Sequence, residues 1–291
     1  MIIKAPIDLE LTQNSGQTSQ PPWKLDNNIY SDVVVADNKA VLFQVKQKEN
    51  NLDFNFIGDI SNKEATKKIK TIFDLDFNLN KFYKYLNNQP ELADMTNFCR
   101  DLRLFLAKDK FECVISSVCS ANNSIVRWTK SIDDIKKSWG NKYTYSEKDY
   151  FTFPDVSDFK NIYCDDVEEF ECCSNLNNPG ECINNLKSCG VGYRAPYMKK
   201  ASEIFTLEMD LDDISKMSYD EAFDTMLKVP GVGPKVADCI LLYGFNFRQA
   251  FPTDVWIKRI VSYLYFDGKD INVSKIREFG MEEFGDYAGY V

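Results

Sequence analysis

A Pro-Gly-Val-Gly segment at 230–233 separates two stretches of helical periodicity, and it constrains the fold more than any other feature of the chain. The first helix is expected to end near Lys228. The second is expected to begin at Pro234, because proline suits a first helical turn, where its missing N–H would have had no partner. Gly231 and Gly233 let the backbone turn tightly and approach a partner closely. The sequence therefore predicts two helices joined by a tight hairpin.

The rest of the chain changes its period about a third of the way along. Three β-rich runs, separated by turn-forming Asn, Asp and Gly, indicate an antiparallel meander at 33–38, 39–47 and 52–59. From Leu79 onwards apolar residues recur at steps of three and four, which is typical of helices. We expect an α+β protein, with an antiparallel β-rich domain over residues 1–108 and a helical domain over 109–291.

Composition limits the chemistry. The 291 residues include no histidine, which excludes Ser-His and Cys-His hydrolases and every zinc site that contains histidine. Acid–base work must then fall to carboxylate, lysine, cysteine or tyrosine. The nine cysteines are an odd number without a secretion signal, so we expect an intracellular protein. No apolar run approaches the ~20 residues that a membrane span needs, and we expect no membrane contact.

The net charge of −9 hides an asymmetry. Residues 145–225 carry −11, and the remainder of the chain sums to +2. Residues 226–260 carry +3, which permits a DNA surface there without demonstrating one. The acidic insert near 155–189 is expected to face away from phosphates. Its cysteines have spacings that match neither zinc knuckles nor an iron–sulfur loop, so we expect free thiols and no metal, with a metal site as the alternative: Cys164, Cys172, Cys173, Cys182 and Cys189.

Lys235 is the first candidate catalytic residue. It falls in the first turn of the helix that begins at Pro234, where the helix dipole disfavours a cation by roughly 0.3–1 kcal/mol. Such breaches of a local rule are typical of functional sites. An amine placed there is a candidate nucleophile, and the alternative is a solvated lysine that contacts phosphate.

Asp254 lies nineteen residues further on, in Phe-Pro-Thr-Asp-Val-Trp at 251–256. It is well placed to cap a helix that begins at Val255. A carboxylate oriented in this way could also steer protons beside Lys235 and stabilise a cationic intermediate. The two roles are compatible.

The chain resembles the helix–hairpin–helix (HhH-GPD) DNA glycosylase superfamily, and within it the 8-oxoguanine DNA glycosylase branch. The resemblance rests on four motifs in the same order along the chain, and it covers about Leu9 to Tyr290. The motifs are Asn-Ser-Gly-Gln at 14–17, Ser-Ala-Asn-Asn-Ser-Ile-Val-Arg at 120–127, Cys-Gly-Val-Gly-Tyr-Arg-Ala-Pro-Tyr at 189–197 and Val-Gly-Pro-Lys-Val-Ala-Asp-Cys at 232–239. It implies a TBP-like N-terminal domain.

The resemblance implies a bifunctional glycosylase and abasic-site lyase that needs no cofactor. A damaged nucleotide would be flipped out of the duplex, because its sugar carbon cannot be attacked within the stack. Lys235 would attack that carbon, expel the oxidised base and form a Schiff base, and Asp254 would assist. β-Elimination would then nick the strand. Gly231, Gly233 and Val236 would offer backbone N–H groups to phosphate.

Base recognition follows the same resemblance. The backbone carbonyl of Gly16 would accept the N7 hydrogen that 8-oxoguanine carries and guanine lacks, and a buried mismatch of this kind can discriminate by ~10⁴. Cys239 would line the base site. Without the resemblance, Ser15 to Gln17 is a plain turn and Cys239 is equally a small core residue.

The resemblance also assigns residues to the opposite strand. Asn122 would fill the hole, Tyr193 would wedge the stack, and Arg127 and Arg194 would hold the orphaned base. Two guanidinium groups supply only donors and therefore suit cytosine, which offers two acceptors. Alternatively, the asparagines at 122–123 cap a helix and either arginine contacts only phosphate. We expect a monomer that acts on double-stranded DNA with oxidised guanine, located with the chromosome.

Three departures from the family pattern leave other functions open. The loop at 18–23 is about two residues longer than expected, the acidic insert is long, and the chain stops at Val291. In the family the next residues supply a Gln and a Phe to the flipped base, so we expect weak base excision and surviving lyase activity from this length of chain. The alternatives are a DNA-damage-binding protein without catalysis, or a glycosylase of the superfamily for another lesion.

Overall fold

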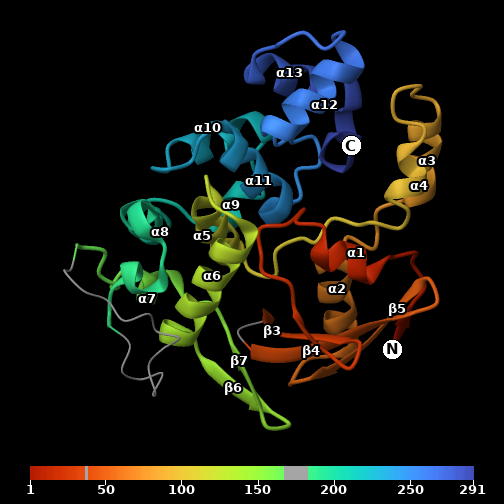
Figure 1. The fold of residues 1–291 in the computed structure, drawn as a ribbon. Coiled ribbons are helices and arrows are strands. Elements are labelled where there is room, and N and C mark those ends of the chain that lie inside the picture. Colours follow the sequence, from red (N-terminus) through yellow and green to blue (C-terminus); the bar gives the residue numbers. More distant parts are fainter. Residues whose placement is uncertain (37–38, 167–182) are drawn as a thin grey trace.

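The computed structural model describes residues 1–36, 39–166 and 183–291 (Figure 1). The N-terminal part holds a sheet in the order β1-β5-β4-β3-β2, in which every neighbouring pair is antiparallel. Its strands are β1 (Ile2–Ile3), β2 (Lys24–Asp26), β3 (Ile29–Ala36), β4 (Lys39–Lys48) and β5 (Asn51–Ile57). The predicted meander is confirmed as β3 to β5. The predicted Asp37-Asn38 turn lies outside the described residues.

Helix α2 (Asn62–Ile72) packs on the sheet. It begins with a capping box, in which the Ser61 hydroxyl accepts the Glu64 N–H and the Glu64 carboxylate accepts the Ser61 N–H. Its buried face joins the sheet and the aromatic rings of Trp23, Phe73 and Phe105 in one apolar core. The sheet is thereby half covered, which explains its alternation of buried and exposed residues.

The C-terminal part is helical, and it supplies the largest core. Helix α11 runs through this core and packs against α5 and α10. The helices are α5 (Lys110–Ser120), α6 (Ile125–Trp139), α7 (Val156–Phe159), α8 (Ala195–Leu207), α9 (Leu211–Ile214), α10 (Tyr219–Leu227), α11 (Pro234–Phe245), α12 (Val255–Tyr265) and α13 (Val273–Phe284). The predicted helix–hairpin–helix is therefore α10 and α11.

One strand pair interrupts the helical part and differs from the all-helical expectation. Strands β6 (Lys142–Tyr145) and β7 (Lys148–Phe151) form a hairpin that reaches toward the sheet (Figure 1). Its buried Tyr150 packs with Val33 and Leu42 of the sheet. The hairpin covers part of the second sheet face, which is a tertiary reason for strands in this segment.

A third core joins residues 79–92 to residues 251–288. Helix α3 (Leu79–Asn87) shares apolar contacts with α12 and α13. The N-terminal part also contains the short helices α1 (Leu9–Asn14) and α4 (Met95–Phe98). The Tyr290 ring stacks on Phe77 with 3.8 Å between ring centroids, and its hydroxyl donates to Asp74 over 2.8 Å. The boundary near residue 108 stays a prediction.

The acidic insert is described only at its two ends. Asp166 forms an ion pair with Lys187, in the 3-10 helix Leu186–Cys189. Cys172, Cys173 and Cys182 lie outside the described residues. Cys164 is a free thiol, and the Cys189 Sγ lies 3.9 Å from the Ser138 hydroxyl. Among the described helices, none is long and apolar enough to span a bilayer.

Candidate active site

The hairpin between α10 and α11 is built around a close contact at Gly231. Its φ of +83° is in the left-handed region, and an added Cβ would lie 2.8 Å from the Tyr197 ring. Only glycine fits this position without strain. Gly233 is the N-cap of α11, where an added Cβ would meet nothing within 4 Å. The hairpin therefore presents an open backbone at the start of α11.

Helix α11 places Lys235, Cys239 and Tyr243 on one face, because residues four apart in a helix are neighbours. Lys235 is exposed in the first turn, and Cys239 and Tyr243 follow, buried, at successive turns. Lys235 and Cys239 are one helical turn apart, so the amine and the thiol lie on the same side of α11. Burial raises the pKa of that thiol, and the Lys235 charge opposes the rise. Cys239 is thus a neutral thiol beside a cation.

Asp254 completes this group from the start of α12. Its Oδ1 accepts the N–H groups of Trp256 at 2.8 Å and Ile257 at 2.9 Å, so the predicted helix cap is confirmed. Its charge also acts on the Cys239 thiol, raising its pKa. The carboxylate is exposed and held by the helix cap, and its charge acts on the same Cys239 thiol as the charge of Lys235. Such an arrangement suits proton transfer and the stabilisation of a cation.

The loop that carries Gly16 lies against the same helix. Gly16 has a φ of +74°, and an added Cβ would approach the Ile125 side chain to 3.1 Å. The Tyr243 hydroxyl donates to Gln17 Oε1 over 2.9 Å. The loop of Gly16 is thus tied to α11 one turn beyond Cys239, and Ile125 connects it to the start of α6.

The turn after α5 carries Asn122 with a φ of +51° and an exposed side chain. The Arg194 guanidinium holds this turn by donating to the Ala121 carbonyl from Nε at 2.8 Å and from Nη2 at 2.6 Å. Nη2 also donates to the Asn122 carbonyl at 2.9 Å. Arg194 lies 4.5 Å from the Tyr193 ring, which is 59% exposed. These three predicted residues form one unit.

The helix-capping alternative holds for the neighbour of Asn122 and not for Asn122 itself. The Asn123 side chain donates to the Cys119 carbonyl and accepts the Ser124 N–H. Ser124 in turn caps α6. The Asn122 side chain has no hydrogen bond to another described residue, so it is available to a ligand.

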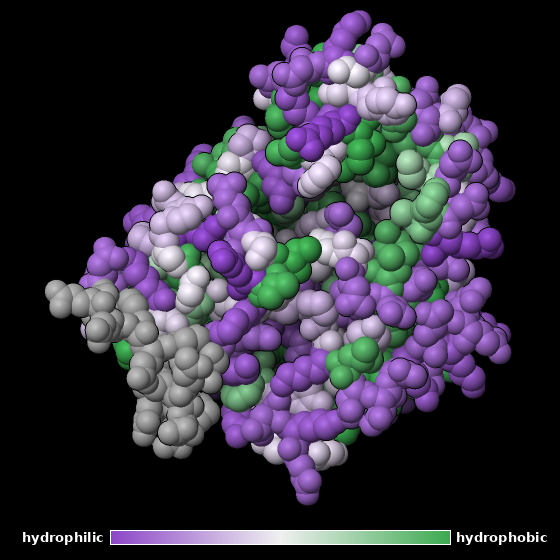
Figure 2. All heavy atoms as spheres, viewed as in Figure 1, coloured by the Kyte–Doolittle hydropathy of each residue, from purple (hydrophilic) through white to green (hydrophobic). Residues whose placement is uncertain are grey.

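Arg127 stands apart from this unit on the exposed surface of α6. No ion pair joins its guanidinium to a described residue. Two exposed apolar side chains, Ile125 and Val126, precede it in the first turn of α6. Figure 2 shows apolar residues at the centre of the viewed face, ringed by hydrophilic ones. This surface borders both the Asn122 turn and Gly16.

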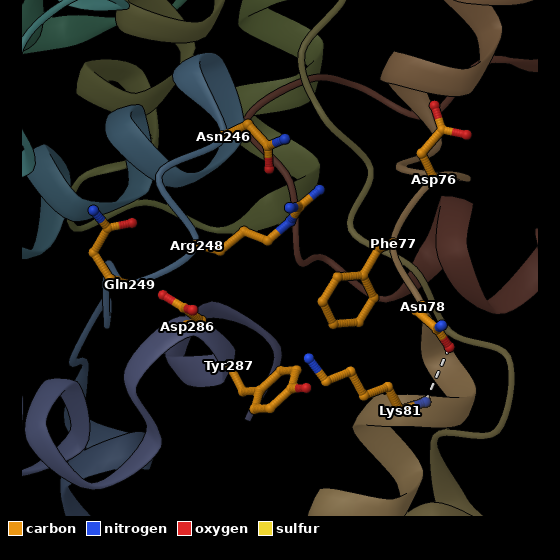
Figure 3. A pocket seen from close by; sticks show the side chains of 9 residues that line it. All are labelled: Asp76, Phe77, Asn78, Lys81, Asn246, Arg248, Gln249, Asp286 and Tyr287. Atoms are coloured by element: carbon orange, nitrogen blue, oxygen red, sulfur yellow. Dashed lines mark hydrogen bonds between the residues drawn. The ribbon is translucent and has the colours of Figure 1, made fainter.

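Two surface pockets lie outside this group of residues. One, of about 640 Å³, lies between Phe77, Arg248 and Tyr287 (Figure 3). Its lining side chains come from residues 76–81, 246–249 and 286–287. This pocket includes Asn246, which follows the last residue of α11. At a rise of 1.5 Å per residue, Asn246 lies about 16 Å from Lys235 along the helix axis. The other, of about 460 Å³, lies on α12 beside Arg259 and Tyr263. Neither contains a predicted site residue.

The structure adds residues to the site that the sequence motifs do not single out as functional. Tyr243 is one, and its position four residues after Cys239 was a usable signal. Gln17 and Ile125 fall inside the quoted motifs without an assigned role. No cluster of metal-binding side chains occurs in the described ranges, which leave out residues 37–38 and 167–182.

Comparison with known proteins agrees with this arrangement. Residues 1–114 match the 8-oxoguanine DNA glycosylase N-terminal domain family, and residues 115–285 match the HhH-GPD superfamily of base excision DNA repair proteins. A probable N-glycosylase/DNA lyase of Methanothermobacter thermautotrophicus is 43% identical over 98% of this chain and 90% of its own length.

Solved structures extend the likeness to the fold. The apo form of Clostridium acetobutylicum 8-oxoguanine glycosylase/lyase has a TM-score of 0.79 and 28% identity, and the match covers 99% of this chain and 92% of that one. The same enzyme bound to double-stranded DNA with cytosine opposite 8-oxoG also scores 0.79 at 28% identity, covering 100% and 93%.

The fold and the hairpin site define a helix–hairpin–helix base excision DNA repair glycosylase. Within that superfamily the chain belongs to the 8-oxoguanine glycosylase/lyase family. The enzyme class is a bifunctional N-glycosylase and DNA lyase. The predicted family and fold class are confirmed, and the roles of individual site residues stay predictions.

Proposed function

We propose that Lys235 is the nucleophile of both reactions. The observation that carries the proposal is the group of Lys235, Cys239 and Asp254 at the start of α11, directly behind an open glycine hairpin. The amine attacks C1′ of a flipped nucleotide, and the glycosidic bond breaks with its electron pair leaving on the base. The departing base takes up a proton. The amine loses a proton, and the C1′–O4′ bond then breaks with its electron pair and a proton going to O4′. This opens the sugar and leaves an iminium, the Schiff base between Nζ and C1′.

Asp254 assists both halves of this sequence. Its carboxylate stabilises the cationic intermediate beside Lys235 and carries protons between the amine and the sugar. Loss of a C2′ proton then breaks the C3′–O bond, which nicks the strand, and water releases the lysine. The backbone N–H groups of Gly231, Gly233 and Val236 hold the phosphates, as the open start of a helix suits an anion.

The substrate proposal rests on Gly16. Its carbonyl accepts the N7 hydrogen of 8-oxoguanine and repels the N7 lone pair of guanine. The contact of Gln17 with Tyr243, on the face of α11 that carries Lys235 and Cys239, supports a base held between them. Double-stranded DNA with oxidised guanine is then the partner, and the protein acts on it as a monomer at the chromosome.

The opposite strand is read by the unit around Asn122. Asn122 fills the hole left by the flipped nucleotide, and Tyr193 wedges the stack. Arg127 and Arg194 offer donors to cytosine, whereas thymine and adenine would each leave donors unpaired at ~1–3 kcal/mol per group. The exposure of Asn122, Tyr193 and Arg127 supports this assignment. Excision opposite cytosine is expected to exceed excision opposite adenine about ten-fold, a ~1.4 kcal/mol difference.

Borohydride trapping tests the lysine. Wild-type protein should form a covalent complex with duplexes that carry 8-oxoguanine opposite cytosine, and Lys235→Gln should form none while DNA binding is retained. Lys228→Gln is the matched control, because Lys228 is an exposed lysine at the other end of the same hairpin. Undiminished trapping by Lys235→Gln would exclude the assignment. Binding without trapping or cleavage by wild-type protein would favour a damage-binding protein.

A further inference from the structure

One hydrogen bond joins the helix of the nucleophile to the loop of the base reader. The Tyr243 hydroxyl donates to Gln17 Oε1 over 2.9 Å, between residues 226 positions apart in the sequence. The tyrosine ring is 5% exposed and lies two turns beyond Lys235 on the same face of α11. Burial raises the pKa of Tyr243 well above its ordinary value, so the hydroxyl stays protonated and remains a donor.

The far half of this loop has anchors of its own. The Thr18 hydroxyl donates to the Phe105 carbonyl at 2.8 Å, and the Gln20 amide donates to the Leu106 carbonyl at 2.6 Å. The Ser19 hydroxyl bonds to Ser117 of α5 at 2.9 Å. The longer loop of this chain is therefore fastened at residues 18–20 to the segment before α5 and to α5 itself.

Residues 16–17 depend on different contacts. Gly16 takes the left-handed conformation, and because glycine has no Cβ, other conformations are open to its peptide planes unless a neighbour holds them. Gln17 is the neighbour, and its side chain is fixed by Tyr243. The peptide between Gly16 and Gln17 is also held locally, because the Gln17 N–H donates to the Ser15 hydroxyl at 3.1 Å. The bond from Tyr243 ties this peptide to α11, and therefore sets the direction of the Gly16 carbonyl relative to Lys235.

We propose that Tyr243 is a positioning residue that sets lesion specificity, by holding Gln17 and thereby aiming the Gly16 carbonyl at N7 of the flipped base. The inference rests on the proposed function of Gly16. Discrimination between N–H and a lone pair needs a fixed acceptor, because a carbonyl that can swing away both loses the bond to 8-oxoguanine and escapes the repulsion by guanine. Reactions that involve no base do not depend on it.

Tyr243→Phe is the test, since it removes only the hydroxyl and keeps the packed ring. Single-turnover excision of 8-oxoguanine opposite cytosine should fall about ten-fold, as expected for one lost hydrogen bond, and its ratio to guanine excision should fall with it. Cleavage at a preformed abasic site should stay within about two-fold of wild type. Gln17→Leu should reproduce both results.

The double variant and a control separate positioning from packing. Adding Gln17→Leu to Tyr243→Phe should cost little more, because both changes delete the same bond. Tyr83→Phe is the control. The Tyr83 hydroxyl accepts the Asp101 N–H at 2.7 Å, and neither residue belongs to this site, so the variant should leave the excision ratio unchanged.

The outcomes are distinguishable. If wild-type protein shows no preference for 8-oxoguanine over guanine, the proposed function fails and the inference fails with it. If wild type shows the preference and Tyr243→Phe keeps it, only the inference is overturned. An equal loss of excision and abasic-site cleavage in Tyr243→Phe would also overturn it, because that pattern indicates general damage to the site.

Discussion

At the scale of a single residue, the carboxylate of Asp254 has a structural role and a proposed catalytic one. It caps α12 through Oδ1, and its charge acts on the same Cys239 thiol as the charge of Lys235. Asparagine caps helices as well as aspartate does, so Asp254→Asn should keep the melting temperature within about 2 °C. The same change removes the negative charge and should slow base excision about 100-fold or more. Thermal unfolding and single-turnover kinetics check the two parts.

Asp254→Ala extends this comparison. It deletes the cap as well and should cost about 1 kcal/mol of stability in addition to the lost activity. Excision by Asp254→Asn at the wild-type rate would show that the carboxylate serves only as a cap.

Cys239 reports on the position of Lys235. Burial raises the pKa of this thiol, so its alkylation rate should climb with pH through the neutral range instead of levelling off. The Lys235 cation favours the thiolate, and Lys235→Gln should therefore raise the thiol pKa further and slow alkylation at each pH. Mass spectrometry of the modified peptides measures both rates. Exposed Cys99 is the internal control, and an unchanged Cys239 rate would place Lys235 elsewhere.

Single residues differ in how far the sequence announces them. Lys235 and Asp254 are visible because each breaks or satisfies a local rule at a helix start. The contact of Tyr243 with Gln17 and that of Arg194 with Asn122 span 226 and 72 positions, and no local pattern links such residues. The sequence alone could name Arg194 through resemblance, but it could not show where the guanidinium rests.

The hairpin between α10 and α11 separates two uses of glycine at the scale of an element. Gly231→Ala should lower stability by about 1–3 kcal/mol, because a φ of +83° strains alanine and its Cβ would press on the Tyr197 ring. Gly233 has a φ of −95° and open space around it. Gly233→Ala should therefore unfold like wild type, while phosphate approach becomes harder and DNA binding weakens.

Urea unfolding and DNA titrations test this pair of variants. Equal free energies of unfolding for Gly231→Ala and Gly233→Ala would mean that the Tyr197 ring moves aside without destabilising the fold.

Elements were predictable where periodicity is long and local. The α10–α11 pair, the start of α12 and the strands β3 to β5 follow from period and turn chemistry. The hairpin β6–β7 was not foreseen, because four-residue strands have little pattern of their own and gain their stability from Val33 and Leu42 of the sheet. The two-residue β1 likewise exists through its pairing with β5.

Buried charges connect the sheet and the helices at the scale of the whole molecule. Lys136 of α6 forms an ion pair with Glu112 of α5, with 2.5 Å between Nζ and Oε1, and both side chains are almost fully buried. Burial alone would lower the pKa of Lys136, but Glu112 and the nearby Asp32 of β3 outweigh it and raise the pKa above its ordinary value. Asp32 in turn pairs with Lys108.

Lys136→Met would leave Glu112 buried without its partner. The free energy of unfolding should fall by about 3–5 kcal/mol, the cost typical of breaking one side of a buried pair. Lys70→Met, which breaks an exposed pair with Asp76, should cost only ~0.2–1 kcal/mol. Urea denaturation compares the two, and similar losses would show that water reaches the Glu112 site.

The way Arg194 is held has a consequence for the search along undamaged DNA. Its guanidinium already donates to the carbonyls of Ala121 and Asn122, so it reaches an orphaned base only by exchanging these hydrogen bonds for new ones. Cytosine supplies acceptors for that exchange, and thymine and adenine supply them incompletely. An intact duplex presents no orphaned base, so Arg194 keeps its hydrogen bonds to the carbonyls of Ala121 and Asn122. We therefore expect encounters with normal sequence to be brief, with a dwell time set by phosphate contacts alone and with rejection needing no active step.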